Sequence, residues 1–183
     1  MQTVLKTREE LLTYLPENSV GVEIGVFKGE FTDTILEVVN PSRLYLVDPW
    51  VGTIDSGDKD GYNTQTIQGE LYFQHHIIPK YNSNPNITIL RNYSKILQTF
   101  KDNTFDWVYI DGDHSYSGVQ FDLSIALTKV KKNGIITGHD YTSGMFPGVV
   151  RAVDEFCLHN DFQIQYITQD ICPSYLIYNK KIS

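Results

Sequence analysis

The chain has 183 residues, of which 41% are hydrophobic and 20% charged, proportions that suit a soluble globular domain large enough to bury its own core. Its formal net charge of −7 argues against a general binder of nucleic acid or anionic membranes, because neutralising phosphates requires clustered Lys and Arg. No apolar run approaches the roughly 18 residues of a membrane span, and the N-terminal segment lacks the apolar core of a signal peptide. Cys157 and Cys172 lack a redox or zinc spacing, so we expect a cytoplasmic protein.

In chain order, hydrophobic periodicity predicts helices that alternate with short strands. A capping box beginning at Thr7 predicts a first helix over about 7–15, which we expect to pack on the core. Residues 51–63 are rich in Gly, Asp, Ser and Thr, which predicts an exposed loop. The remaining predicted elements are strands over 19–24, 43–47, 86–90, 105–110, 135–137, 162–167 and 175–178, and helices over 31–39, 64–81, 94–97, 117–130 and 147–158.

This alternation predicts a parallel, doubly wound α/β sheet. The last two strands are joined by a short connection containing Pro173, so we expect them to form an antiparallel hairpin at one edge of the sheet. The sequence shows no repeat, linker or low-complexity segment, and residues 1–183 are predicted to form one domain.

The most informative stretch runs from residue 21 to residue 31. Val22 and Ile24 alternate with small or acidic positions as in a strand, Gly25 ends that strand, Gly29 follows four residues later, and helical periodicity begins at Phe31. A strand, a glycine turn and a helix in this order can bind a nucleotide-like ligand at the helix N-terminus. The plainer alternative is a tight strand-to-helix connection without a ligand.

This turn departs from the G-x-G-x-x-G fingerprint of dinucleotide sites, because no glycine stands between Gly25 and Gly29 and the bulky Phe27 hinders close approach of a pyrophosphate. Glu23 would repel a phosphate and attract a cation. Asp48 ends the next strand, where a carboxylate can bind ribose hydroxyls, although it could equally be a turn former before Pro49. A positively charged nucleoside therefore fits these features better than NAD does.

A second group of polar residues follows the strands over 105–110 and 135–137: Asp111, Asp113, His114, His139 and Asp140. If these strands are neighbours, their ends lie about 4.8 Å apart, within reach of a shared ion or substrate. Carboxylates together with water would suit Mg²⁺, and the histidines would alternatively suit Zn²⁺ or Mn²⁺. The plainer alternative is a turn at Asp111 and a helix cap at Asp113.

Four of these segments, taken in order, carry a family resemblance. Residues 23–29 resemble motif I (E/D-x-G-x-x-x-G) of class I S-adenosylmethionine-dependent methyltransferases, and residues 46–50 resemble the acidic motif at the end of their second strand. Residues 106–116 and 134–141 are similar to later motifs of a small branch related to the macrocin-type sugar O-methyltransferases, with more distant kinship to the catechol type. The similarity covers roughly residues 18–180.

The resemblance implies a Rossmann-like, seven-stranded, mostly parallel sheet with helices on both faces and an antiparallel final strand. It implies S-adenosylmethionine as cofactor, its amino-acid part facing the turn, its ribose at Asp48 and its adenine bordered by three further residues. The cofactor-binding positions are then Glu23, Gly25, Val26, Phe27, Gly29, Asp48, Trp50, Tyr93, Ser94 and Asp111. Related O-methyltransferases also bind a divalent metal, for which Asp111 and Asp140 are the matching residues. Tyr141 stands where the catechol type has Asn, which leaves His139 as the candidate third ligand.

Together these observations predict a methyltransferase acting on a hydroxyl of a small molecule, such as a sugar, a phenol or a secondary metabolite. Asp111 and Asp140 would hold a metal, most simply Mg²⁺, that lowers the pKa of the hydroxyl, and His114 would take its proton. The alternatives are an NAD-dependent oxidoreductase, a metal-dependent hydrolase and a non-catalytic nucleoside-binding module. We expect no nucleic-acid or membrane partner, and a homodimer is left open.

Overall fold

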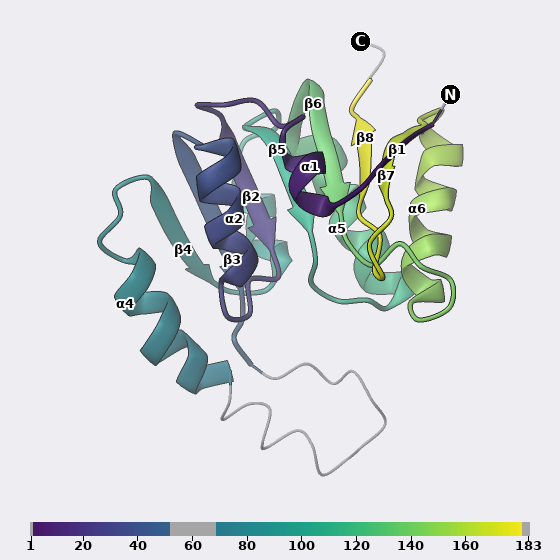
Figure 1. The fold of residues 1–183 in the computed structure, drawn as a ribbon. Coiled ribbons are helices and arrows are strands. Elements are labelled where there is room, and N and C mark those ends of the chain that lie inside the picture. The colour runs from purple at the N-terminus through teal and green to yellow at the C-terminus, as the bar shows by residue number, and fades with distance from the viewer. Residues whose placement is uncertain (1, 52–68, 181–183) are drawn as a thin grey trace.

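The structure, a computed structural model, describes residues 2–51 and 69–180. Within these ranges one eight-stranded sheet has the order β1-β7-β8-β6-β5-β2-β3-β4 (Figure 1). Its strands are β1 (Thr3–Leu5), β2 (Val20–Ile24), β3 (Arg43–Asp48), β4 (Ile87–Arg91), β5 (Phe105–Ile110), β6 (Val130–Gly138), β7 (Ile164–Thr168) and β8 (Tyr175–Tyr178). The helical elements are α1 (Arg8–Leu12), α2 (Glu30–Val39), the π-helix η1 (Phe73–Ile77), α4 (Ile78–Tyr81), the 3₁₀-helix η2 (Ser94–Thr99), α5 (Tyr116–Lys129) and α6 (Pro147–Asn160).

The sheet confirms the predicted fold class and adds one strand. All pairings are parallel except those of β8, which runs antiparallel to both β6 and β7. The prediction missed β1, which pairs in parallel with β7 through Thr3 and Tyr166 and so covers the hairpin that we expected to form an edge. A strand of three residues is too short to show an alternating pattern, which is why the sequence did not reveal it.

The first helix is shorter than the predicted span of 7–15. Thr7 caps it as expected, with its hydroxyl accepting from the Glu10 backbone N–H at 3.2 Å. After Leu12 the chain continues in turns instead of further helix. Leu11, Leu12 and Leu15 are nevertheless buried, so this segment packs on the core as predicted.

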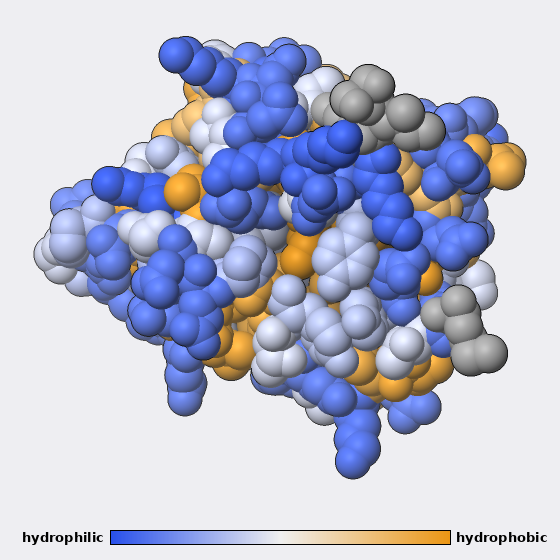
Figure 2. Space-filling view, turned by 90° about the horizontal axis from the view of Figure 1, so that it is seen from above, coloured by the Kyte–Doolittle hydropathy of each residue, from blue (hydrophilic) through white to orange (hydrophobic). Residues whose placement is uncertain are grey.

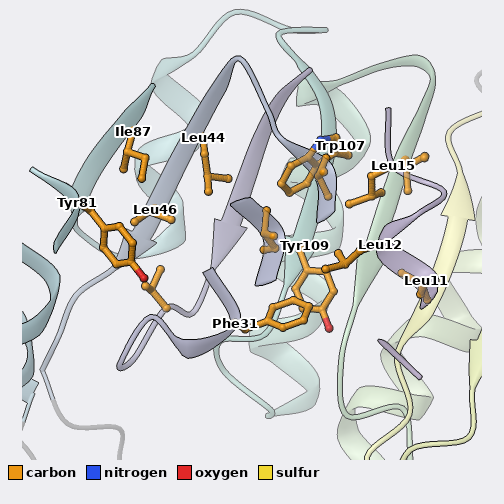
Figure 3. Close-up of a cluster of buried hydrophobic side chains, with 14 of the residues drawn as sticks. Leu11, Leu12, Leu15, Phe31, Leu44, Leu46, Tyr81, Ile87, Trp107 and Tyr109 are labelled. Atoms are coloured by element: carbon orange, nitrogen blue, oxygen red, sulfur yellow. The ribbon is translucent and has the colours of Figure 1, made fainter. Parts of the chain in front are cut away.

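Apolar side chains cover both faces of the sheet, as expected for a doubly wound fold. The strand β5 shows this alternation. Trp107 and Tyr109 belong to one buried cluster, with residues of α1, α2 and α4 (Figure 3). Val108 and Ile110 belong to the other, with residues of η2, α5 and α6. Each large apolar side chain buried in this way contributes about 1.5–3 kcal/mol relative to an exposed one. The two clusters make the sheet a rigid platform for the turns at its ends.

The segment between β3 and β4 is only partly described. The loop predicted over 51–63 lies outside the described residues apart from Val51, as do the first five residues of the helix predicted over 64–81. Residues 69–81 are helical, and the hydrogen bonds widen to a π-helix over Phe73–Ile77. Such insertions are frequent at functional sites. Among the described residues, no helix is both long and apolar enough to cross a membrane.

Candidate functional site

The neighbouring strands β2, β5 and β6 end side by side. The glycine turn follows β2, and the predicted acidic and histidine residues follow β5 and β6. Backbone hydrogen bonds continue past the strand ends, from Asp111 N–H to the Ile24 carbonyl at 2.8 Å and from His139 N–H to the Ile110 carbonyl at 3.0 Å. The glycine turn after β2 therefore lies directly beside the segment after β5, which in turn lies beside the segment after β6. Ligands of open α/β sheets bind at this carboxyl edge. Figure 2 shows the opposite edge, where the parallel strands begin, and polar residues cover most of that face.

The glycine turn needs glycine because of its contact with the protein itself. Gly25 has φ +87°, and a Cβ there would lie 1.9 Å from the Asp111 carbonyl oxygen. Gly29 has φ +78°, and a Cβ there would lie 2.7 Å from the Tyr81 hydroxyl. Both positions thus combine a left-handed backbone with close packing, which excludes other side chains. The turn is held against β5 on one side and against α4 on the other.

Asp48, the predicted ribose ligand, organises this turn. Its Oδ2 accepts hydrogen bonds from the backbone N–H groups of Val26 and Phe27, both at 2.9 Å, and its Oδ1 accepts from the N–H of Trp50 at 2.6 Å. A carboxylate can accept more hydrogen bonds than these three. The residue can therefore support the turn and still accept from a ligand hydroxyl.

Two bulky residues of the site adopt left-handed backbone conformations. Phe27 has φ +50° and Trp50 has φ +46°, each of which costs about 1–3 kcal/mol and is typical of functional sites. The indole N–H of Trp50 donates to the Phe27 carbonyl at 2.8 Å, and its ring is buried against Phe73. Trp50, predicted to border the adenine, therefore supports the turn from the core, whereas Phe27 exposes 59% of its surface.

Glu23 is buried beneath the turn. Its carboxyl is 1% exposed and accepts a hydrogen bond from the Thr32 hydroxyl at 2.6 Å. Burial raises the pKa of Glu23 to about 8. The carboxyl is therefore mainly protonated near pH 7, and a cation bound beside it would favour release of that proton.

Two residues that were predicted to border the adenine follow β4. Tyr93 exposes 58% of its surface, and Ser94 is the first residue of η2. Ser94 also reveals a residue that the sequence reasoning missed, Asp122 on α5, which is 3% exposed. Burial raises the pKa of Asp122 to about 6, and a hydrogen bond with Ser94 opposes that rise. The available signal was an aspartate on the apolar stripe of the helix, three residues after Val119 and four before Ala126.

The structure brings the acidic and histidine residues after β5 and β6 together. Nε2 of His114 lies 2.8 Å from Oδ2 of Asp140. Nδ1 of His139 lies 3.3 Å from Oδ1 of Asp140 and 3.6 Å from Oδ1 of Asp111. Asp111, His139 and Asp140 each offer one ligand atom, and these atoms lie within 4.8 Å of one another. The two strand ends thus form one cluster.

The aspartates and histidines of this cluster change one another's pKa values. Burial raises the pKa of Asp140, but hydrogen bonds from His114 and His139 lower it more, so that it falls well below its usual range. Burial lowers the pKa of His139, but Asp111 and Asp140 raise it more, to about 9. In the absence of other cations, His139 is therefore protonated near pH 7 and neutralises one of the two carboxylates.

The donor set fits a divalent cation. Two carboxylates and one imidazole are ligands for Mg²⁺, Mn²⁺ or Zn²⁺, and a bound cation would replace the proton that His139 carries. A small cavity lies beside Asp111, His114 and His139, with apolar walls from Val119 and Val149. The residues present are therefore compatible with the predicted metal.

The plainer alternative for Asp113, a cap on the following helix, is wrong. The N-cap of α5 is Ser115, whose hydroxyl accepts from the Gly118 N–H at 3.1 Å. Asp113 instead accepts from the Ser115 N–H at 2.8 Å. It shapes the turn that leads from Asp111 into the helix without capping the helix itself.

A mostly parallel sheet with one inserted antiparallel strand, here β8, and a glycine turn at its carboxyl edge is the class I methyltransferase fold. A family model described as a methyltransferase domain matches residues 22–141. The chain therefore belongs to that methyltransferase family, which confirms the resemblance found in its motifs. No curated protein matches the sequence.

Solved structures show the same fold at low sequence identity. The O-methyltransferase NovP is 19% identical, with a TM-score of 0.68 over 95% of this chain and 80% of that one. The N-methyltransferase NodS from Bradyrhizobium japonicum WM9, in complex with S-adenosyl-L-homocysteine, is 13% identical, with a TM-score of 0.63 over 95% of this chain and 86% of that one. Spermidine synthase from Thermotoga maritima, at 16% identity and a TM-score of 0.58 over 96% of this chain and 60% of that one, shows that the fold alone does not determine the reaction.

Proposed function

We propose that this protein binds S-adenosylmethionine at the glycine turn and transfers its methyl group to a hydroxyl oxygen of a small molecule. The observation that carries the proposal is the direct contact between the turn and the acidic cluster, since the Asp111 N–H donates to the carbonyl of Ile24. A cofactor on the turn would present its methyl group beside that cluster. Family membership and the S-adenosyl-L-homocysteine bound by NodS support the cofactor, and NovP supports transfer to oxygen.

Methyl transfer from a sulfonium is a direct displacement, so the protein has to align acceptor oxygen, methyl carbon and sulfur. It also has to remove the acceptor's proton. Asp140 faces Nε2 of His114, which favours the tautomer with its proton on Nε2, so that Nδ1 is the atom that accepts a proton. Asp140 thus orients His114 as the general base.

The predicted metal would be held by Asp111, His139 and Asp140, whose ligand atoms lie within 4.8 Å of one another. When bound, a divalent ion would lower the pKa of an acceptor hydroxyl and so increase its nucleophilicity. His139 has to give up its proton to become a ligand, so binding would be favoured by rising pH.

The other functions weighed from the sequence have less support. An NAD-dependent oxidoreductase would need room for a pyrophosphate at the turn, where the backbone amides of Val26 and Phe27 are already bonded to Asp48. A metal-dependent hydrolase would share the cluster but would have no need for the turn, and a non-catalytic module would have no need for the cluster. A cytoplasmic enzyme that acts on a free small molecule, alone or as a homodimer, remains our proposal.

The experiment that tests the function is calorimetric titration with S-adenosylmethionine and S-adenosylhomocysteine, followed by methyl-transfer assays on panels of sugars and phenols. We expect binding of both nucleosides and methylation of one acceptor class. His114→Asn should abolish transfer with little effect on binding, whereas His159→Asn, at an exposed position on α6, should leave both unchanged. Failure to bind either nucleoside, with or without Mg²⁺, would contradict the proposal.

A further inference from the structure

The candidate site is rich in negative charge, which suits only part of the proposed cofactor. Asp48 lies at the glycine turn and Asp111 and Asp140 lie in the acidic cluster, and these carboxylates attract the sulfonium and ammonium ions of S-adenosylmethionine but repel its carboxylate. His139 is engaged with Asp111 and Asp140. A cation from another element is needed to receive the carboxylate.

Arg8, the first residue of α1, lies close to this edge of the sheet. Its guanidinium carbon is 4.2 Å from the centre of the Phe31 ring, and the Phe31 ring centre is 4.6 Å from that of Tyr109 (Figure 3). Phe31 follows Gly29 by two residues, and Tyr109 precedes Asp111 by two. The guanidinium therefore lies on the face of the sheet covered by α2, near the carboxyl ends of β2 and β5.

The electrostatic influence of Arg8 agrees with this position. Burial raises the pKa of Glu23, Tyr109 and Cys172, and the positive charge of Arg8 opposes the rise in all three. Cys172 belongs to the turn between β7 and β8 and also senses the charges of Asp140 and Asp111. The charge of Arg8 is thus felt both by Glu23, at the end of β2, and by Cys172 in that second turn.

The guanidinium remains accessible for a ligand. Its side chain is 31% exposed, and the one carboxylate among the described residues within 4.0 Å is that of the neighbouring Glu9, at 3.9 Å from Nε. Lys28, a cation within the glycine turn, lies instead over the rings of Phe27 and Tyr72. A guanidinium supported by an aromatic ring can bind a carboxylate through two parallel hydrogen bonds.

We propose that Arg8 binds the carboxylate of the cofactor's methionine part and so orients the sulfonium toward the acidic cluster. This inference rests on the proposed function and adds a residue from outside the motifs to the cofactor site. It also gives α1 a role besides packing, because the helix carries Arg8 at its exposed start and Leu11 and Leu12 on its buried side.

The test compares two ligands that differ only in this carboxylate, S-adenosylmethionine and its decarboxylated form, by calorimetry. The wild-type protein should bind S-adenosylmethionine about tenfold to a hundredfold more tightly, the range expected for a charge-assisted, bidentate interaction. Arg8→Gln should remove this preference and leave the affinity for the decarboxylated form unchanged. Arg8→Lys, which keeps the positive charge but lacks the planar guanidinium, should retain part of the preference for S-adenosylmethionine.

Arg151 provides a matched control, since its guanidinium lies 4.3 Å from the Tyr116 ring centre and its Nε lies 2.9 Å from Glu155. Arg151→Gln should leave both affinities unchanged. Equal weakening of both ligands by Arg8→Gln, or a preference that survives it, would overturn the inference. If the wild-type protein binds neither ligand, the proposed function is wrong. If it binds both ligands equally well, the proposed function stands and only the role of Arg8 is wrong.

Discussion

Nε2 of His114 lies 2.8 Å from Oδ2 of Asp140 and 3.9 Å from Oδ1 of Asp111. Asp140 is nearly buried and has φ +60°, a conformation that aspartate tolerates better than most residues. The strained backbone directs one carboxylate oxygen to His114 and the other to His139. One aspartate therefore positions both histidines.

Asp140→Asn keeps the size of the side chain but removes its charge, so His114 should lose the tautomer and the electrostatic support that a base requires. We expect the rate of methyl transfer to fall by about 10²–10⁴-fold, the usual contribution of general-base catalysis. The affinity for S-adenosylhomocysteine should change little. Single-turnover rates and calorimetry separate the two effects, and an unchanged rate would show that His114 is not the base.

Glu23 should make stability depend on pH. Its pKa is raised to about 8 in the folded protein, above the value of about 4.3 in an unfolded chain. The favourable contribution of Glu23 to the free energy of unfolding is therefore complete below about pH 4.3. It is lost as pH rises to about 8, because the unfolded chain releases the proton first. Glu23→Gln removes this titration and should be the more stable protein at about pH 8, by up to about 5 kcal/mol.

Urea unfolding of wild-type protein and Glu23→Gln over this pH range measures the effect. Glu17→Gln, at an exposed position, is the control and should follow the wild-type curve. If the wild-type and Glu23→Gln curves stay parallel, Glu23 does not change its protonation on unfolding.

Metal binding should depend on Asp111. We expect Mg²⁺, Mn²⁺ or Zn²⁺ to raise the melting temperature of the wild-type protein and to have no effect on Asp111→Asn, because the variant loses one of the three clustered ligands. Affinity should increase as pH rises toward about 9, the pKa to which Asp111 and Asp140 raise His139. Full activity after exhaustive chelation, together with no thermal shift for any of these ions, would exclude the metal assignment.

Tyr81 should couple the helical segment over residues 69–81 to the glycine turn. Its buried hydroxyl lies 2.7 Å from the Gly29 carbonyl oxygen and 2.8 Å from Oδ1 of Asp33. Tyr81→Phe leaves the carbonyl without this donor, and we expect a loss of about 1–2 kcal/mol in unfolding free energy. It should also weaken the binding of S-adenosylmethionine by loosening the turn.

Tyr93→Phe is the matched control, since Tyr93 is 58% exposed. It should leave the unfolding free energy unchanged in chemical denaturation. Cofactor affinity that is normal in Tyr81→Phe despite lower stability would show that the turn keeps its shape without this contact.

The sequence alone determined most of the strands and helices and the similarity of the motifs to those of methyltransferases. The limits of the strands over 105–110 and 175–178 were predicted as observed, because short apolar runs and the turn residues that flank them are local properties. The glycines at 25 and 29 were recognised as a turn for the same reason, and the acidic strand ends were found by their place after apolar runs. These features depend only on neighbours in the chain.

The tertiary structure decided which of these residues meet. Asp48 and Val26 are 22 positions apart, and Arg8 and Phe31 are brought together by packing of α1 on α2. Burial of Trp50 and of Asp122, and the parallel pairing of β1 with β7, likewise follow from long-range packing. The order of strands β2, β5 and β6 places the glycine turn beside the acidic cluster, because hydrogen bonding between strands distant in sequence, and not any local preference, sets that order.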